Sequence, residues 1–189
     1  VATFGGYVND YGYSVAVDSS GNVYTAGLFY RTVDFDPGSG TEQQEHRYSL
    51  YDGAAGYLLK LDSSGDYAWV AVFDGSRTDA AYGVAVDSSD NVYVTGDFQN
   101  TVDFDPGAGT TNLTSNSTNI SDTFVVKLDS SGDLVWAKSF GGSSNHETGR
   151  AIAVDSSGNV YVTGEFHATA DFDPGDGTAE LTPGASANG

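Results

Sequence analysis

Three copies of one short acidic segment carry the residues best suited to chemistry in this sequence. Each copy reads Asp-Phe-Asp-Pro-Gly. Residues i and i+2 of an extended strand point to the same side, so the two carboxylates of a copy converge on one region. Paired carboxylates and loop carbonyls are the hard oxygen ligands that Ca²⁺ takes, about six to eight per ion. The candidate metal ligands are Asp34 and Asp36, Asp103 and Asp105, and Asp171 and Asp173.

The same segments can also be explained without a metal. The second Asp can start the Pro-Gly turn, while the first caps a neighbouring backbone N–H. Pro at the second and Gly at the third position of Asp-Pro-Gly-X predict a type II turn. The sequence leaves both interpretations open. If a metal does bind, acidic residues of nearby loops could complete its site, namely Asp10, Asp79, Glu147, Asp97 and Glu165.

Other catalytic arrangements have little support. The sequence has no Cys, which excludes thiol nucleophiles and thiolate metal sites. No Gly-x-Ser-x-Gly segment suggests a hydrolase elbow. A carboxylate pair could serve a glycosidase, but its threefold recurrence argues against this, because one pair is needed per site. The three histidines, His46, His146 and His167, share no repeat position and are expected on surface loops.

The charge of the chain limits its partners. With 26 acidic and 7 basic residues, the formal net charge is −19. Such a surface repels nucleic acid and anionic lipid, so we expect neither as a partner. It also repels itself, which favours bound divalent cations or a salty medium. No apolar run approaches the roughly 18 residues that a membrane span needs, so no membrane insertion is expected.

A longer repeat must position these carboxylates. The stretch Val84–Phe98 reads VAVDSSDNVYVTGDF, and similar stretches cover Val15–Phe29 and Ile152–Phe166. Period-two patterning rich in Val, Tyr and Thr, split by a Ser/Asp/Asn cluster, predicts a β-hairpin. The turn aspartates follow one another at intervals of 69 and 68 residues, which indicates a repeat architecture. These aspartates are Asp18, Asp87 and Asp155.

The turn and the second strand of this hairpin carry two specific predictions. Asp-Ser-Ser-Gly-Asn fits a type I turn followed by a left-handed Gly. In the middle copy Asp90 replaces that Gly, and Asp tolerates the left-handed region better than most residues. A glycine near the end of the second strand marks a place where another backbone is expected to pass close by. It recurs as Gly27, Gly96 and Gly164.

A second hairpin completes the unit. Residues 57–73 and 124–140 share its pattern, and Trp69 and Trp136 occupy matching places, where we expect them to pack between units. No 3.6-residue periodicity of useful length appears. The sequence therefore predicts an all-β fold of tandem four-stranded antiparallel blades of the β-propeller type. Each repeat spans about 68 residues, and the array is incomplete at both ends.

The predicted boundaries follow from the repeat. Residues 1–6 are assigned to the last strand of a preceding blade, 7–75 to blade 1, 76–142 to blade 2 and 143–189 to the first half of blade 3. An incomplete blade leaves strand edges that invite pairing. We therefore expect other copies of the same chain, or adjacent repeats of a longer parent, as partners. A fragment, a closed ring of chains and an open stacked assembly all remain possible.

The motifs together resemble a known family. The recurring VAVDSSGNVYVTG pattern, the KLDSSGDLVWAK hairpin and VDFDPGxGT resemble the SBBP family of bacterial β-propeller repeats, and more loosely NHL-type repeats. The resemblance implies a secreted or cell-surface bacterial protein with propeller repeats beside adhesion or sorting modules. It supplies no catalytic residues. Leu28 departs from the other units, which carry Asp97 and Glu165 at its position.

These observations favour a non-catalytic, extracellular structural or adhesive module whose loops are rigidified by Ca²⁺. The alternative is a carbohydrate-binding propeller that uses loop aromatics and carboxylates of one face, with glycans as partners. A polysaccharide lyase or glycosidase is a third hypothesis, for which the sequence offers no single-copy acidic site.

Overall fold

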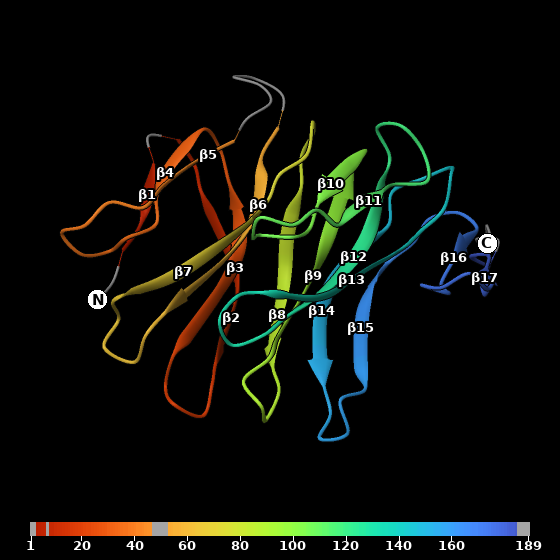
Figure 1. The fold of residues 1–189 in the computed structure, drawn as a ribbon. Coiled ribbons are helices and arrows are strands. Elements are labelled where there is room, and N and C mark those ends of the chain that lie inside the picture. The colour runs from red at the N-terminus through yellow and green to blue at the C-terminus, as the bar shows by residue number, and fades with distance from the viewer. Residues whose placement is uncertain (1–2, 7, 47–52, 185–189) are drawn as a thin grey trace, which may run out of the picture.

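The protein is all-β, as the sequence predicts. A computed structural model describes residues 3–6, 8–46 and 53–184, and within them it contains β-strands and no α-helix. The described part of the chain accordingly has no helix that could cross a membrane. Figure 1 shows the strands grouped into sheets that follow one another from the N-terminal to the C-terminal side.

Blade 1 is a four-stranded antiparallel sheet. Its strands are β2 (Tyr11–Val17), β3 (Val23–Phe29), β6 (Ala55–Leu61) and β7 (Tyr67–Phe73). Their order in the sheet is their order along the chain. Short hairpins connect β2 to β3 and β6 to β7, whereas a longer segment of the chain lies between β3 and β6.

Blade 2 repeats the arrangement, and the third unit repeats its first half. Blade 2 contains β8 (Ala80–Val86), β9 (Val92–Gln99), β12 (Ser121–Leu128) and β13 (Leu134–Phe140) in sequence order. The third unit contains the two-stranded sheet of β14 (Thr148–Val154) and β15 (Val160–Glu165).

Each unit also carries a short antiparallel ribbon that the sequence did not predict. The ribbon follows the second strand of its unit. The Asp-Phe-Asp-Pro-Gly segment begins with the last residue of the first ribbon strand and continues into the ribbon loop. In blade 1 it gains a third strand, which is the described end of the strand expected at residues 1–6. The ribbon strands are β1 (Gly5–Gly6), β4 (Thr32–Asp34), β5 (Gln43–Glu45), β10 (Thr101–Asp103), β11 (Asn112–Thr114), β16 (Ala170–Asp171) and β17 (Glu180–Leu181).

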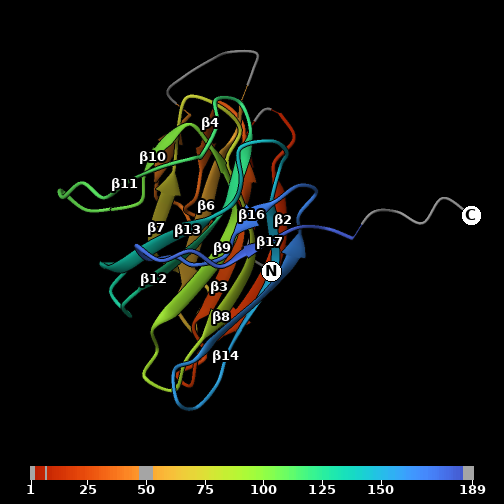
Figure 2. The same cartoon turned by 90° about the vertical axis from the view of Figure 1, so that its right-hand side faces the viewer.

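The blades stack through their first strands. β8 of blade 2 contacts β2 on one side and β14 on the other, and it also packs on β3. The fourth strands β7 and β13 lie further out, which the turned view in Figure 2 helps to follow. This radial arrangement is that of propeller blades, here in an open array.

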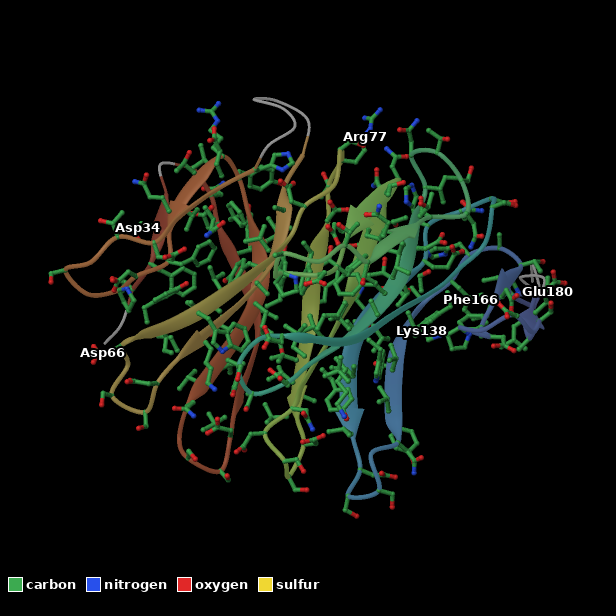
Figure 3. The ribbon with its side chains drawn as sticks, viewed as in Figure 1. Asp34, Asp66, Arg77, Lys138, Phe166 and Glu180 are labelled. Atoms are coloured by element: carbon green, nitrogen blue, oxygen red, sulfur yellow. The ribbon has the colours of Figure 1, made fainter. Side chains whose placement is uncertain are left out.

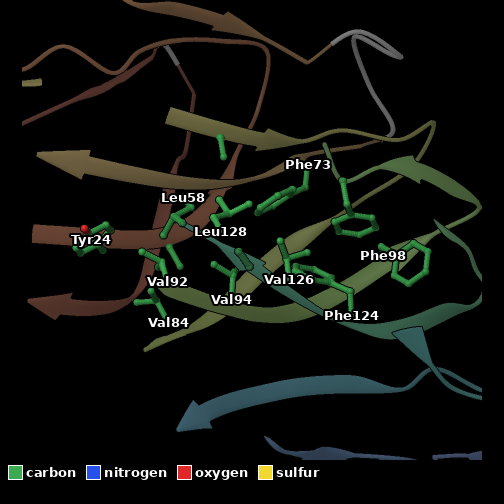
Figure 4. Packing of buried hydrophobic residues seen from close by; sticks show 14 of the residues in the cluster. Tyr24, Leu58, Phe73, Val84, Val92, Val94, Phe98, Phe124, Val126 and Leu128 are labelled. Atoms are coloured by element: carbon green, nitrogen blue, oxygen red, sulfur yellow. The ribbon is translucent and has the colours of Figure 1, made fainter. Parts of the chain in front are cut away.

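Most of the hydrophobic core lies between blades 1 and 2. Tyr24 and Leu58 of blade 1 face Val94, Val126 and Leu128 of blade 2, all of them fully buried (Figure 4). These positions alternate with outward-facing ones along their strands, as period-two patterning requires. Two units therefore bury each other, and neither could bury its apolar face alone.

A cluster of four aromatic side chains fills the outer core of each complete blade. In blade 2, Phe124 of β12 lies 5.6 Å from Phe73, 4.9 Å from Phe104 and 6.4 Å from Phe98 between ring centroids. Such tilted and edge-to-face pairs are favourable beyond their buried area. The equivalent rings of blade 1 are Phe4, Phe29, Phe35 and Tyr57.

The predicted hairpin geometry is confirmed. The turn glycines adopt left-handed φ values of 82° to 92°, and Asp90 adopts the same region at 60°. The close backbone contact expected at the glycine of the second strand is also present, because a Cβ added to Gly96 would clash with the Ala80 carbonyl oxygen. The turn glycines are Gly21, Gly65, Gly132 and Gly158.

Candidate functional site

We call the three ribbons with their loops the acidic hairpins. Their aspartates accept the same backbone hydrogen bonds in every copy. In blade 2, the Asp103 Oδ1 accepts hydrogen bonds from the backbone N–H groups of Asp105 (3.1 Å) and Thr111 (2.8 Å). The Asp105 Oδ1 accepts one from Gly107 N–H at 2.8 Å. The corresponding bonds of Asp34, Asp36, Asp171 and Asp173 have lengths of 2.7 to 3.1 Å.

This geometry corrects the predicted turn type. A type II turn needs a positive φ at its third residue, but Gly107 and its counterparts Gly38 and Gly175 are not among the glycines with positive φ. The side chain of the second Asp closes the turn instead, as Asn and Asp often do. The second glycine of the loop is needed for space, because a Cβ on Gly109 would clash with the Asp105 carboxylate.

The acidic hairpins line two equivalent grooves between successive units. Asp103 and Asp105 border a cavity of about 220 Å³ together with Glu45 and Asp74 of blade 1. Asp171 and Asp173 border one of about 330 Å³ against β13. In the described part of the chain, no three His, Asp or Glu side chains come close enough together to hold a metal ion. Calcium binding therefore stays a prediction, and an ion here would need backbone carbonyls and water.

The latch carboxylates, Asp10, Asp79 and Glu147, hold the start of each unit to the preceding strand. Asp79 accepts hydrogen bonds from the N–H groups of Gly75 (2.7 Å) and Gln99 (3.0 Å). Burial raises its pKa well above the ordinary range, although both bonds favour the charged form. Asp10 makes the matching bonds at 2.7 and 3.3 Å, and Glu147 makes one of them, to Gly142 N–H at 3.0 Å. These three side chains thus connect the start of each unit to the preceding strand, and their part in a metal site stays a prediction.

The first strand of each unit carries a β-bulge, and the extra residues of the three bulges form one row. They are Tyr13, Tyr82 and Arg150, which we call the bulge row. The ring centroids of Tyr13 and Tyr82 are 4.9 Å apart, and the Arg150 guanidinium carbon lies 5.0 Å from the Tyr82 ring centroid. A bulge re-aims a side chain, which places these three on the shared face of the first strands.

Asp97 and Glu165 lie beside the bulge row, and their role as metal ligands stays a prediction. Burial raises the pKa of Asp97 to about 6, while Ser121 and then Arg150 favour its charged form. Proximity to Asp97, after burial, raises the pKa of Tyr82 to about 12. Glu165 pairs with Arg150 at 3.1 Å on the surface. The counterpart Leu28 of blade 1 is buried, so the first junction lacks this charge.

A serine and a histidine meet beside Asp97, in a contact that resembles a catalytic pair. The Ser121 hydroxyl lies 3.0 Å from His146 Nδ1. The same nitrogen accepts the Ser121 backbone N–H at 3.0 Å. Ser121 is 1% exposed, so a substrate cannot reach its hydroxyl. The contact caps the start of β12 and does not form a nucleophile with its base.

Blade 1 contains a buried His–Asp hydrogen bond that the sequence did not predict. His46 was expected on the surface, but its side chain is 1% exposed, and its Nδ1 lies 2.6 Å from the Asp74 carboxylate. His46 follows β5, and Asp74 follows β7, 28 residues further along the chain. No local pattern links the two positions. Ser115 and Gly141 replace them in the next unit, so the pair is specific to blade 1.

The fold and these repeated contacts define a tandem β-propeller repeat. A sequence profile described as the SBBP β-propeller repeat matches residues 4–28 and 135–165, so these two regions are similar to SBBP repeats. An uncharacterized WD repeat-containing protein of Acanthamoeba polyphaga mimivirus is 27% identical over 159 residues. The match covers 82% of this chain but 11% of that relative. The looser similarity to NHL-type repeats stays a prediction.

Proposed function

We propose that this chain is a non-catalytic module of a secreted or cell-surface protein, in which the blades form a rigid support and their exposed faces bind partners. The observation that carries this proposal is the uniform use of the acidic pairs. In all three copies the carboxylates best suited to catalysis accept backbone N–H bonds of their own hairpin. The match to a propeller-repeat profile and a relative named for WD repeats support a repeat module.

Three features support the extracellular and adhesive parts of the proposal. The net charge of −19 keeps the module soluble and repels anionic surfaces. The absence of Cys makes the fold independent of the redox state of its compartment. Large side chains are exposed on both end faces, among them Val15 at 65% and Leu181 at 55%. Exposed apolar surface of this kind marks interaction sites.

Ca²⁺ remains a proposed ligand of the acidic hairpins. The described hydrogen bonds of Asp103 and Asp105 are accepted by their Oδ1 atoms, which leaves the Oδ2 atoms as candidate ligands. These residues also share an acidic groove with Glu45 and Asp74. Binding of the ion to the folded state alone would raise the melting temperature. A thermal melt in millimolar Ca²⁺ and in chelator tests this. Equal melting temperatures would refute calcium binding and would not affect the proposal of a non-catalytic module.

Carbohydrate binding is the second candidate, because one feature favours it. Tyr11 and Tyr13 are 43% and 45% exposed and stack in parallel, with ring centroids 6.0 Å apart and an interplanar angle of 5°. Aromatic faces of this kind can pack on the apolar face of a sugar ring. The Tyr82 ring adds a third aromatic side chain to this stacked pair, since it lies beside that of Tyr13.

One set of measurements separates the three functions. The chain is applied to a glycan array and, separately, incubated with neutral and acidic polysaccharides while reducing ends and unsaturated products are followed. The module proposal expects no product. Glycan binding that disappears in Tyr11→Ala with Tyr13→Ala, but persists in Val135→Ala at a distant exposed site, would favour the second candidate. Product formation above a heat-inactivated control would refute the proposal.

A further inference from the structure

The ribbon of blade 2 carries a cluster of acceptor sequences for N-linked sugars. The sequence Asn-x-Ser/Thr begins at Asn112, Asn116 and Asn119, so that all its copies lie within residues 112–121. With any residue except Pro in the middle, this sequence is the acceptor for N-linked glycosylation. The segment comprises β11 and the connection to β12. It contains no charged residue, in a chain whose formal net charge is −19.

Asn112 is the acceptor that the fold leaves accessible. It is exposed at the start of β11, and within the described part of the chain its side-chain amide makes no hydrogen bond. Thr114, two residues later on the same strand, is also exposed, and its hydroxyl lies 2.9 Å from that of Thr101. Residues i and i+2 of a strand lie on one face. The amide and the hydroxyl of this acceptor sequence are therefore presented together at the surface.

The Asn116 amide is already used inside the fold. Its backbone N–H and its side-chain Nδ2 donate hydrogen bonds of 2.9 and 2.8 Å to Asp122 Oδ2. Asp122 is 1% exposed. A sugar on Nδ2 would replace one of its two hydrogens and would place a sugar ring beside this buried carboxylate. Weakening a hydrogen bond to a buried carboxylate destabilises the folded state, so the fold disfavours a glycan at Asn116.

The acceptor sequence of Asn119 lacks an accessible hydroxyl. Its third residue is Ser121, which is 1% exposed and whose hydroxyl lies 3.0 Å from His146 Nδ1. Asn119 itself adopts a left-handed φ of 64°, and its backbone N–H donates to Asn100 Oδ1 at 3.2 Å. A transferase that must bind the hydroxyl of the acceptor sequence cannot reach it in the folded chain. The structure thus distinguishes Asn112 from the other two acceptors.

The second strand of each ribbon is an open edge, and of these three strands β11 is the one without a charge. Blade 1 shows that the edge stays open where the following blade is complete, because among the described residues β5 pairs with β4 alone. Charged side chains commonly protect such edges from pairing with other chains. β5 ends at Glu45 and β17 begins at Glu180, which Figure 3 labels, whereas β11 reads Asn-Leu-Thr. A bulky polar group on β11 would supply the missing protection.

From these observations we propose that Asn112 carries an N-linked oligosaccharide that shields the uncharged edge of its ribbon. The donor is an oligosaccharide attached to a lipid pyrophosphate. In the transfer, Asn112 Nδ2 forms a bond to C1 of the first sugar, and the bond from C1 to the pyrophosphate oxygen breaks. Nδ2 loses one proton to a base of the transferase, and the lipid pyrophosphate leaves. The inference rests on the secreted location proposed above, because such transferases act on exported chains.

The test uses the full chain behind a cleavable secretion signal, produced in a eukaryotic host cell and purified from the medium. An amidase that releases N-linked glycans in heavy-oxygen water converts each modified Asn to labelled Asp, and mass spectrometry then identifies its position. We expect the label at Asn112 and not at Asn116 or Asn119. Asn112→Gln should lose the whole sugar mass. Thr118→Ala removes the acceptor sequence of Asn116 at an exposed residue, without touching the Asp122 bonds, and should leave the sugar mass unchanged.

A second measurement tests the shielding of the edge. The same chain made in a bacterial cytosol has a bare Asn112, and light scattering compares its self-association with that of the glycosylated chain. We expect the bare chain to associate at lower concentration. Asn112→Glu, also made in bacteria, gives β11 the charge that β5 and β17 have, and it should reduce the association. Asn145→Glu adds the same charge at an exposed residue outside the ribbon and should leave the association unchanged.

A secreted chain without label at Asn112 would overturn the proposal, and so would equal labelling of Asn116 or Asn119. Equal self-association of the bare chain, the glycosylated chain and Asn112→Glu would overturn the shielding role. None of these outcomes bears on the polysaccharide or calcium measurements. Failure of this inference and failure of the proposed function are therefore distinguishable.

Discussion

Blades 2 and 3 begin with nearly the same hairpin sequence, yet the two copies are buried very differently. Tyr93 is 1% exposed in blade 2, whereas its counterpart Tyr161 is 57% exposed. Val94 is fully buried, while Val162 is half-buried. The strands of both hairpins pair internally in the same register. Local sequence therefore determines the hairpin, and the third and fourth strands of the unit determine whether its apolar face becomes core.

The two junctions between units differ in a second way. At the first junction the latch is Asp79, with both carboxylate oxygens hydrogen-bonded, and Ala55 lies at the start of the third strand. At the second junction the latch is Glu147, and Asp122 replaces that alanine. One oxygen of each, Asp122 Oδ1 and Glu147 Oε1, is buried without a described partner. The junctions therefore differ in how these buried carboxylates are paired, because both oxygens of Asp79 have a hydrogen-bond donor.

The largest expected effect tests the difference in packing. Phe124→Ala should destabilise the protein by about 3–5 kcal/mol, because it removes the central ring of a fully buried four-ring cluster. Phe172→Ala in the three-ring cluster should cost roughly 1–2 kcal/mol, since that ring is half-buried and loses less burial. Urea denaturation of both variants measures the two free energies of unfolding. Equal costs would show that the third unit is packed as tightly as the second.

The next effect compares two latch carboxylates. Asp79→Ala leaves the N–H groups of Gly75 and Gln99 without an acceptor in a buried site, which should cost about 2–4 kcal/mol. Asp10→Ala breaks the matching bonds nearer to solvent, where water can replace the carboxylate, so we expect a loss under about 1 kcal/mol. The same denaturation experiment decides. A cost for Asp10→Ala as large as that for Asp79→Ala would contradict the role of burial.

A pH-dependent effect tests the electrostatic difference between the junctions. Burial raises the pKa of Asp122 to about 6 from an ordinary value of 3.8, so between these pH values the folded chain keeps a proton that the unfolded chain releases. The stability from this group is complete below pH 3.8 and is lost as the pH rises through 6. Asp122→Asn cannot ionise, and its amide oxygen can still accept the Asn116 bonds. It should match the original protein near pH 4 and exceed its stability by roughly 1–3 kcal/mol at pH 7.

Asp87→Asn provides a control of opposite sign for this measurement. Hydrogen bonds from Asn91, Ser89 and Tyr93 outweigh burial and lower the pKa of Asp87. Its contribution is present above the unfolded pKa and is lost as the pH falls. Asp87→Asn should therefore be less stable than the original protein at pH 7, and the gap should close in acid. Parallel pH profiles of the two variants would refute both assignments.

The sequence predicts those features that depend on backbone periodicity and turn chemistry. Val, Tyr and Thr in alternation specify the hairpins, and Gly96 marks a close backbone contact that the structure contains. The sequence does not predict contacts between residues far apart in the chain, such as His46 with Asp74. It also misses β11, because three polar or mixed residues carry no strand signal. In the acidic hairpins the predicted type II turn was wrong, since the Asp105 side chain closes the loop in place of a left-handed glycine.

The smallest effect concerns the turn at which blade 2 differs from its neighbours. Asp90 adopts φ of 60°, a conformation that glycine reaches without strain and that the other hairpins fill with Gly. Asp90→Gly should therefore stabilise blade 2 by up to about 1 kcal/mol, less the Ser19 contact at 3.3 Å that it removes. Gly158→Ala in the third unit should destabilise the protein by about 1 kcal/mol, because alanine is strained at φ of 82°. No other atom crowds an added Cβ there, so this backbone strain is the whole effect. Thermal melts of the two single variants give both signs. If both changes destabilise the protein, the Asp90 side chain stabilises the turn by more than the strain of its backbone costs.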